Sequence, residues 1–218
     1  VTFNVLDSGG APVATESSYL DVIPAGETVI AGGRVSTDLT GSLPVTVEIT
    51  VFAEEDSFFE TEWAYMEIGP EVEISTDGFR PSVTGTLTNP TDQPVDLFPI
   101  ECLLVDADDN VITEVSGYGD RTSPGQTIAW ELSGSQIEAA INAGAISTEC
   151  ISIASLDGSA SSSGSSSGAS VEGELTSVGR SGFVTYDSLG ETRASVGVEV
   201  TNNSDEDLFF TEVTFNVL

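Results

Sequence analysis

The hexapeptide VTFNVL occurs twice in this chain, at residues 1–6 and again at residues 213–218. An identical match of this length is very rare by chance. It indicates a repeat whose period is 212 residues, the difference between starting positions 1 and 213. Asp7 would follow Leu218 as naturally as it follows Leu6. We therefore expect the chain to be one period of a tandem or cyclic pattern, and its two ends not to be natural ends.

A second, weaker repeat lies inside that period. Residues 196–218, continued into residues 7–28, align without a gap on residues 83–127. The identical pairs fall where turns or strand ends are expected, which gives the alignment more weight than its modest identity. These pairs include Thr201 with Thr88, Asn202 with Asn89, Asp205 with Asp92, Asp7 with Asp106, Tyr19 with Tyr118, Gly26 with Gly125 and Thr28 with Thr127. The period therefore contains two related units.

The two units predict two domains, one of which is divided between the chain ends. The complete domain is expected at residues 58–157. The first half of the divided domain is expected at residues 171–218, and its second half at residues 1–57. Residues 158–170 contain only small and polar side chains, so they cannot bury a core and predict a flexible Ser/Gly linker.

Apolar and polar residues alternate along most of the chain, which is the period of a β-strand. Turn residues recur roughly every 8–12 positions, a spacing typical of antiparallel sandwiches. We therefore predict an all-β fold with two related immunoglobulin-like antiparallel β-sandwich domains, one of them split across the chain ends. Alternation within the two hexapeptides also predicts the inward residues of the strands at the subunit junction. These residues are Val1, Phe3, Val5, Val213, Phe215 and Val217.

One short helix is predicted at Gln136–Ala143. Ser135 and Glu138 have the spacing of a capping box, in which two side chains bind the free N–H groups at the start of a helix. Gly144 is suited to end the helix, because glycine readily adopts the left-handed conformation that follows many helices.

The two cysteines, Cys102 and Cys150, lie in runs that alternate like strands. Cys102 lies opposite Phe215 in the internal alignment, and Cys150 corresponds to the inward Ile49 of the alternating run 45–51, so both are expected to face the core. The chain has no CxxC pair and no histidine, which argues against a zinc site. We expect a disulfide that crosses the sandwich, provided that the two Cα atoms come within about 7 Å. Two free buried thiols are the alternative.

Negative charge dominates the composition, with 36 acidic residues against 5 basic ones and a net charge of −31. This argues against binding nucleic acid or anionic lipid, because both need basic side chains. The acid-rich composition without lysine resembles that of salt-loving archaea, since high salt screens the repulsion between copies. An acidic secreted protein from an ordinary environment is the alternative. Together with a disulfide, the composition favours an extracellular or cell-surface location.

Residues suited to catalysis are scarce in this chain. Histidine and lysine are absent, both cysteines have a structural explanation, and no nucleophile elbow, phosphate loop or dinucleotide motif is present. Carboxylate pairs arise by chance among so many acids, so they are weak support for a glycosidase. No apolar run approaches the roughly 18 residues of a membrane span. The sequence predicts no enzyme, no cofactor and no membrane insertion within this segment.

Two short motifs suggest a ligand site and a modification site. Asp106, Asp108 and Asn110 have the spacing of the first ligands in a calcium loop. Val111 stands where such a loop needs a glycine, so a simple turn is the alternative. Asn202 begins an Asn-Asn-Ser sequon at the end of a strand and is the candidate for N-glycosylation.

One region of each unit resembles a known family. The run FNVLD at residues 3–7 resembles the signature of the FxLYD domain, with Val in place of Leu and Leu in place of Tyr. The run CLLVD at residues 102–106 occupies the same place in the other unit, with Cys in place of Phe. The turns that flank both runs are also similar to those of the family. The resemblance implies small immunoglobulin-like sandwiches of cell-surface proteins without an established chemistry.

The divided domain needs completion, because half a sandwich exposes strand edges and an apolar face. One copy can complete the next by strand exchange, or the chain can be one period of a covalently continuous repeat protein. Both predict a structural subunit of an extracellular filament or stalk, whose partners are copies of itself, joined head to tail. Alternatively, the halves meet within one chain. That predicts a monomeric adhesion or ligand-binding module, with surface glycans or other cell-surface proteins as partners.

Overall fold

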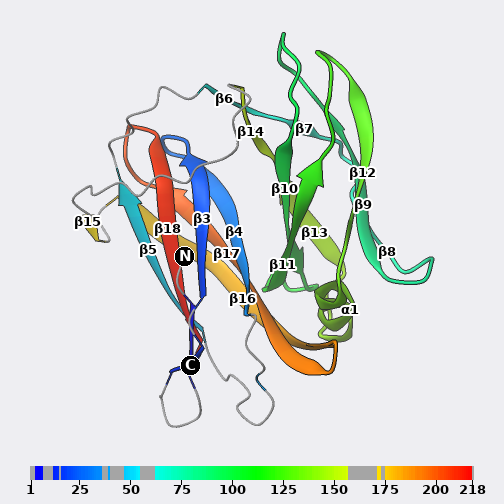
Figure 1. Ribbon diagram of the computed structural model, residues 1–218, viewed down its shortest axis with the longest axis vertical. Helices are drawn as coiled ribbons and strands as arrows, with labels where there is room; N and C mark the ends of the chain where they lie inside the picture. The colour runs from blue at the N-terminus through cyan, green and yellow to red at the C-terminus, as the bar shows by residue number, and fades with distance from the viewer. Residues whose placement is uncertain are drawn as a thin grey trace.

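The computed structural model shows an all-β protein with one short helix (Figure 1). It describes residues 3–6, 12–14, 16–35, 39, 47–54, 62–156, 171–172 and 175–217, with side chains within 17–35, 39, 49–51, 62–156 and 175–208. Val1 and the predicted linker at 158–170 lie outside the described residues.

The elements follow one another in a chain of short strands. In order they are β1 (Phe3–Leu6), β2 (Pro12–Ala14), β3 (Glu16–Ile23), β4 (Thr28–Val35), β5 (Val47–Glu54), β6 (Trp63–Tyr65), β7 (Glu67–Ile68), β8 (Glu73–Ser75), β9 (Ser82–Thr88), β10 (Phe98–Val105), β11 (Val111–Gly119), β12 (Thr127–Ser133), α1 (Ser135–Asn142), β13 (Ser147–Ile151), β14 (Ile153–Ser155), β15 (Val171–Glu172), β16 (Thr176–Ser188), β17 (Glu191–Asn202) and β18 (Leu208–Val217).

Residues 62–156, called the central half below, form a sandwich of antiparallel sheets. One sheet has the order β11-β10-β13, and another has the order β12-β9-β7 with β8 also paired to β9. Apolar positions alternate along these strands, and the inward ones from both sheets share one core that includes Leu87, Ile100, Leu104 and Trp130. Helix α1 adds Ile137 to the same core.

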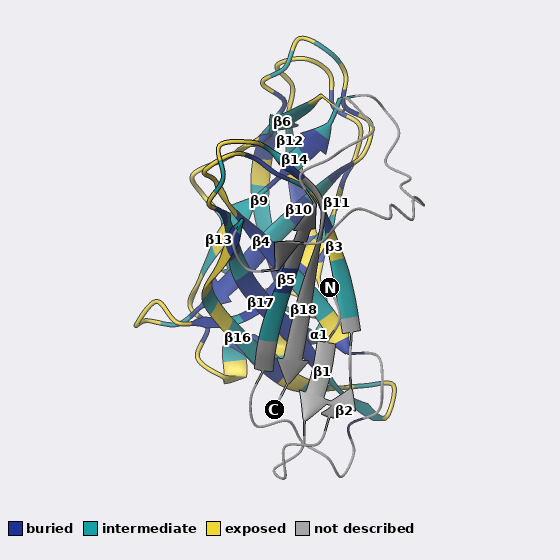
Figure 2. Ribbon diagram, turned by 90° about the vertical axis from the view of Figure 1, so that its left-hand side faces the viewer, coloured by how far each residue is buried: buried dark blue, intermediate teal, exposed yellow. Residues whose placement is uncertain are grey.

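Strands from the two ends of the chain also pack together, and they are called the terminal half below. One sheet has the order β16-β17-β4, and another has the order β15-β5-β18-β1-β2 with β3 also paired to β18. Their inward residues form a second core that includes Leu20, Val29, Val196 and Leu208. The two halves lie side by side (Figure 1), and in both the buried residues follow the strands while the exposed ones gather at turns (Figure 2).

The two halves pair their strands in equivalent registers. Within the ungapped alignment, the paired residues of one half lie opposite the paired residues of the other; Ile49 and Cys150 lie beyond it and are matched as inward residues of corresponding strands. Leu208↔Ile23 corresponds to Val95↔Thr122, Thr211↔Leu20 to Phe98↔Gly119, and Phe215↔Ile49 to Cys102↔Cys150. The weak sequence repeat is thus accompanied by a repeated pattern of strand pairing.

Strand β1 is the exception to this equivalence. It pairs in parallel with β18, with Phe3 opposite Phe215 and Val5 opposite Val217, so the two hexapeptides lie in register. All other strand pairings among the described residues are antiparallel. On its other edge β1 forms a bulged hairpin with β2 that matches the bulged hairpin of β10 and β11. In the central half the single strand β10 pairs with β13 on one edge and with β11 on the other. In the terminal half two strands share this place, because β18 pairs with β5 and β1 pairs with β2.

The predicted helix is confirmed one residue earlier, at Ser135–Asn142, but the predicted capping box is wrong. Gly134 occupies the cap position without a side-chain hydrogen bond, and Ser135 is already helical. The side chain of Gln136 folds against Gly134 and fills the space that a Cβ would need there. Gly144 ends the helix at a φ of 108°, as expected for this residue.

Candidate functional site

A buried asparagine turn recurs in the two halves. Asn202 is fully buried; its Nδ2 donates to the carbonyl oxygen of Glu206 at 2.8 Å, and its Oδ1 accepts from the N–H and the hydroxyl of Ser204. Asn89, also fully buried, makes the corresponding bonds within residues 89–93. The repeat therefore extends to individual hydrogen bonds.

The burial of Asn202 assigns it a structural role in place of the predicted glycosylation. Its Nδ2 also donates to the carbonyl oxygen of Ile23 at 2.9 Å, on a strand from the other end of the chain. A glycan attached to Nδ2 would displace both bonds from a fully buried position. The sequon signal is local, and it carries no information on which way the side chain points.

Replacing Asn202 by alanine is expected to destabilise the chain by about 3 kcal/mol, because it leaves buried polar groups without partners. The melting temperature should fall by roughly 6–12 °C, measured by circular dichroism. The exposed neighbour Asn203 provides the matched control, and Asn203→Ala should have little effect. An unchanged melting temperature for Asn202→Ala, or a glycan found on Asn202 in folded protein, would contradict this role.

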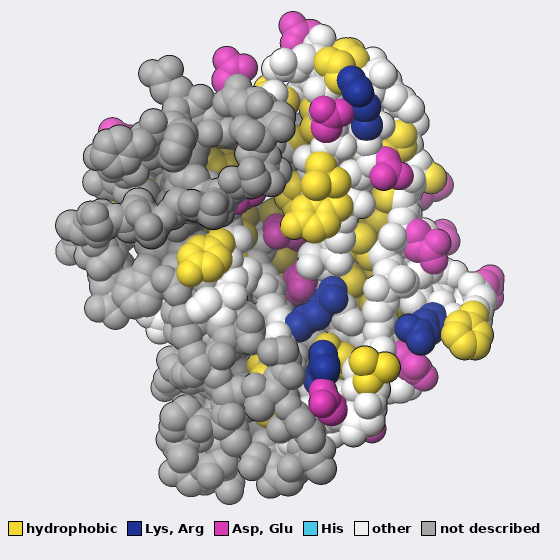
Figure 3. Space-filling view, viewed as in Figure 1, with side chains coloured by type: hydrophobic (Ala, Val, Ile, Leu, Met, Phe, Trp, Pro, Cys, Tyr) yellow, Lys and Arg dark blue, Asp and Glu magenta, His cyan; other side chains and the backbone are white. Residues whose placement is uncertain are grey.

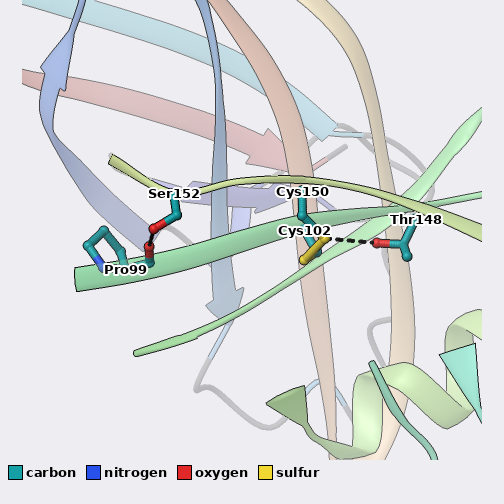
Figure 4. The surroundings of a disulfide bond; sticks show 5 residues. All are labelled: Pro99, Cys102, Thr148, Cys150 and Ser152. Carbon is teal, nitrogen blue, oxygen red and sulfur yellow. Dashed lines mark hydrogen bonds between the residues drawn. A yellow bond between two sulfur atoms is a disulfide. The ribbon is translucent and has the colours of Figure 1, made fainter. Parts of the chain in front are cut away.

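Cys102 and Cys150 form a disulfide, as predicted (Figure 4). The prediction that the bond crosses the sandwich is wrong. It joins β10 to β13 within one sheet, where the two cysteines are direct partners with Cα atoms 4.1 Å apart. Paired residues on adjacent strands turn their side chains to the same face, whereas facing sheets lie about 10 Å apart. Beside the bond, Ser152 donates to the carbonyl oxygen of Pro99 at 2.6 Å (Figure 4).

The calcium candidates form a turn between β10 and β11. Asp106 accepts hydrogen bonds from the backbone N–H groups of Asp108 and Asn110, each at 2.9 Å, and from the Asn110 side chain. The bonds from Asn110 hold the pKa of Asp106 below its usual value. Both carboxylate oxygens of Asp106 thus bind within the turn, which supports the turn alternative. Over the described ranges, no cluster of three or more His, Cys, Asp or Glu side chains is placed to hold a metal ion.

The two halves meet where β11 crosses the sheet β16-β17-β4. Gly182, Gly197 and Gly32 are direct partners on the three strands of that sheet and form a line called the glycine row below. A Cβ at Gly197 would lie 2.6 Å from the backbone nitrogen of Glu114, and one at Gly182 would overlap the carbonyl group of Val111. None of the three has a positive φ, so the close approach of β11 is what requires glycine here.

Three carboxylates from both halves gather beside this contact. Glu114 of β11 is only 2% exposed, and burial raises its pKa to about 7 against the opposing effects of a Ser116 hydrogen bond and the Arg34 charge. Burial, followed by repulsion from Glu114 and Asp21, raises the pKa of Glu101 to about 8. Burial also raises the pKa of Asp21. Burial at the contact between the halves therefore makes Glu101 and Glu114 hold their protons to a higher pH than free carboxyl groups do.

Arg180 on β16 links the halves through three carboxylates. It binds Glu199 in its own sheet, and it binds Glu149 and Asp109 of the central half, the last at 2.8 Å. Hydrogen bonds from Arg180 lower the pKa of Glu199. A second link is the indole of Trp63, whose Nε1 donates to Asp207 at 2.9 Å. The contact between the halves thus combines ion pairs with close backbone packing.

A cleft of about 280 Å³ opens between the halves. Strand β3 contributes Tyr19 and Asp21, while β10 and β11 contribute Glu101 and Tyr118. The two tyrosines are equivalent in the internal repeat and are 66% and 70% exposed. Figure 3 shows acidic side chains recessed between hydrophobic ones on this face. Carboxylates between aromatic walls suit a cationic group, so this cleft is the candidate binding site.

The residues predicted for the subunit junction lie in paired strands. Phe3 and Val5 are in β1, and Val213, Phe215 and Val217 are in β18. The structure brings these two strands together, as described above. The cleft residues were not predicted as a site, and the alignment of Tyr19 with Tyr118 was the one sequence signal that pointed to them.

Comparisons with protein-family models, with curated proteins and with solved structures found no match to this chain. Within the part of the chain that the structure describes, no helix is long and apolar enough to cross a membrane. The function is therefore inferred from the strand pairing and the contacts above.

Proposed function

We propose that this chain is a structural subunit of an extracellular filament or stalk, joined head to tail by completion of a β-sandwich across the junction between copies. The observation that carries the proposal is the parallel pairing of β1 with β18. Two identical strands share a position that the single strand β10 fills in the central half.

The proposal takes the two halves as copies of one immunoglobulin-like domain, complete in the central half and divided in the terminal half. The equivalent registers and the recurring asparagine turn support this. So does a recurring pair of threonine hydroxyls: Thr28 and Thr201 lie 2.8 Å apart, and Thr88 and Thr127 lie 2.7 Å apart. The resemblance to FxLYD domains agrees with such a pair of domains.

The shared position favours a junction between copies. Since either hexapeptide fits the same register, a strand from another copy can take the place of β1 without changing the pairing of β18 with β5. Such an interface joins different surfaces of the two copies, so it propagates into a linear assembly unless the rotation closes a ring. Covalent continuity from one period into the next gives the same junction.

An extracellular, salt-rich setting agrees with the chemistry of the chain. The Cys102–Cys150 disulfide persists in oxidising surroundings. A net charge of −31 keeps copies apart in dilute buffer, whereas the Debye length shrinks to about 3 Å at 1 M salt and the repulsion is screened. Assembly is therefore expected to need high salt.

Electron microscopy of the native material at high salt, with mass analysis after denaturation, tests the proposal. Fibres that fall apart into chains near 22.6 kDa would support strand exchange. Fibres with a far larger denatured mass would support a covalent repeat protein. Discrete monomers at every salt concentration would contradict the filament and favour the monomeric adhesion module.

The duplicated hexapeptide supplies a matched pair of variants. Phe215→Asp should abolish fibres of the recombinant chain, because β18 pairs with β5 over most of its length. Phe3→Asp makes the same change in the other hexapeptide and should leave fibres intact, because residues 213–218 of another chain, which keep Phe215, can take the place of β1. Equal loss of fibres in the two variants would contradict replacement of β1.

A further inference from the structure

A tip on the central half combines an exposed aromatic ring with a positive charge. The turn between β8 and β9 carries Phe79, which is 96% exposed, followed by Arg80. The guanidinium carbon of Arg80 lies 5.8 Å from the centre of the Phe79 ring, so the two side chains form one unit, called the Phe79–Arg80 knob. This turn stands at the edge of the central half far from β3 and β4 (Figure 1), and a hydrophobic side chain projects beside a basic one at that edge in Figure 3.

The cleft between the halves has the complementary character. Its walls include Tyr19, Tyr118 and Leu97, which are 66%, 70% and 50% exposed. Such a grouping of exposed apolar side chains marks an interaction surface more often than scattered ones do. Its floor includes Asp21 and Glu101, whose carboxylates make no hydrogen bond or ion pair with other described residues. A volume of about 280 Å³ is small for a ligand pocket and suits one aromatic side chain.

We propose that the Phe79–Arg80 knob of one copy docks into the cleft of a second copy. Phe79 would lie between the two tyrosines, where aromatic rings pack favourably edge to face or offset. The Arg80 guanidinium would form a charge-assisted hydrogen bond with the Asp21 carboxylate and would also donate to the carbonyl oxygen of the Glu101 carboxyl group. The proposal rests on the proposed function only in taking copies of this chain to be neighbours, and it involves a different surface from the strand junction.

Charge complementarity selects this tip over another one. Leu189, at the turn between β16 and β17, is also 96% exposed. Asp187 and Glu191 flank it and would meet the acidic floor of the cleft with repulsion. Arg80 makes no ion pair inside the described ranges, so its charge is available to a partner. The arginines that do bind carboxylates there are Arg121, Arg180 and Arg193.

The positions of knob and cleft make the contact one between copies. They lie on different surfaces of one chain, so each copy offers a knob to one neighbour and a cleft to another. High salt should favour the contact overall, because it screens the repulsion between two chains of net charge −31 more than it weakens an ion pair enclosed in a cleft.

A photo-crosslinking experiment tests the contact directly. Benzoyl-phenylalanine is placed at position 79, and equal amounts of nitrogen-14 and nitrogen-15 chains are mixed at high salt and irradiated. We expect crosslinks of mixed isotope composition to peptides that contain Tyr19, Leu97 or Tyr118. The same probe at position 189 is the control and should not give them. Crosslinks confined to one isotope, crosslinks to other surfaces, or none from position 79 would overturn the proposal.

Charge variants provide a second test by sedimentation. Arg80→Glu should weaken association at this contact at least tenfold, whereas Arg121→Glu, the same change at another exposed arginine, should not. Adding Asp21→Lys to Arg80→Glu should restore association, while adding Asp120→Lys, the equivalent repeat position outside the cleft, should not. No difference between Arg80→Glu and Arg121→Glu, or no rescue by Asp21→Lys in a variant that melts like wild type, would overturn the contact.

The two proposals fail in different ways. Fibres without crosslinks from position 79 would remove the knob contact and leave the strand junction standing. Crosslinks between copies without fibres at any salt concentration would leave the knob contact standing and remove the filament.

Discussion

Replacing Gly182 by valine is expected to lower the melting temperature by roughly 6–12 °C, because a destabilisation of about 3 kcal/mol shifts a chain of this size by that much. The new Cβ would overlap the carbonyl group of Val111, which belongs to the backbone of β11 and cannot rotate away as a side chain can. The two halves should therefore separate along the glycine row. Thermal unfolding by circular dichroism measures the loss, and small-angle scattering measures the separation.

Ser181→Val is the matched control for this substitution. Ser181 is the exposed neighbour of Gly182 on β16, so the same side chain is added outside the contact with β11. Exposed substitutions usually change stability by less than about 0.5 kcal/mol. An equal loss in both variants, or no loss in Gly182→Val, would show that β11 does not pack against the glycine row as closely as the structure has it.

Raising the pH from 5 to 9 is expected to destabilise the folded chain through Glu101 and Glu114. Unfolded, each carboxyl group titrates near its ordinary value of 4.5; folded, the pKa values are raised to about 8 and about 7. Between these values the folded chain binds more protons than the unfolded one, so stability falls as pH rises. The contribution is fully present below the unfolded pKa and is lost as pH rises through the folded pKa. Melting curves in high salt, which screens the other charges, should show the fall.

The double variant Glu101→Gln with Glu114→Gln should flatten this pH dependence. A difference of one between the folded and unfolded pKa of a carboxyl group corresponds to about 1.4 kcal/mol of stability, and the effect is smaller for Glu101 because its side chain reaches solvent through the cleft. If the free energy of unfolding of the double variant at pH 8 exceeds that of the wild type by roughly 3 kcal/mol, its melting temperature should be higher by roughly 6–12 °C. Glu131→Gln, on the exposed side of β12, is the control and should keep the wild-type slope. A wild-type melting temperature that stays constant or rises over this window would contradict the buried carboxylates.

The inward faces of the strands could be predicted from the sequence, because apolar and polar residues alternate along a strand. The pairing of strands could not, since the Cys102–Cys150 bond was expected to cross between sheets and instead joins neighbouring strands of one sheet. Alternation assigned Phe215 and Cys102 to inner faces, and the alignment placed them at equivalent positions. The structure pairs Phe215 with Ile49 as it pairs Cys102 with Cys150. Turn positions could also be predicted from the sequence: Gly26 and Gly125, which the alignment pairs, both adopt a positive φ, of 72° and 67°.

The contact between the halves could not be predicted in the same way. Glu114 and Glu101 lie on the outer face of their strands, and alternation tells which face a residue occupies without telling what covers that face. Gly32 lies far from Gly182 and Gly197 in the sequence, and the three glycines become neighbours only through the register of their strands. The cleft depends on the same contact, so its residues carried no pattern of their own beyond the aligned tyrosines.

The parallel pairing of β1 with β18 has a consequence for when copies join. The two hexapeptides are identical and in register, so exchanging one for the other alters no contact made by the strand itself. The chain's own hexapeptide and one from a neighbouring chain therefore fit the place beside β18 equally well, and which of them occupies it depends on how often each reaches it. A strand tethered to its own chain acts at an effective concentration on the order of millimolar, whereas a neighbour's strand acts at the concentration of the protein. Under the proposed head-to-tail joining, dilute chains would therefore close on themselves, and concentrated chains would link to one another.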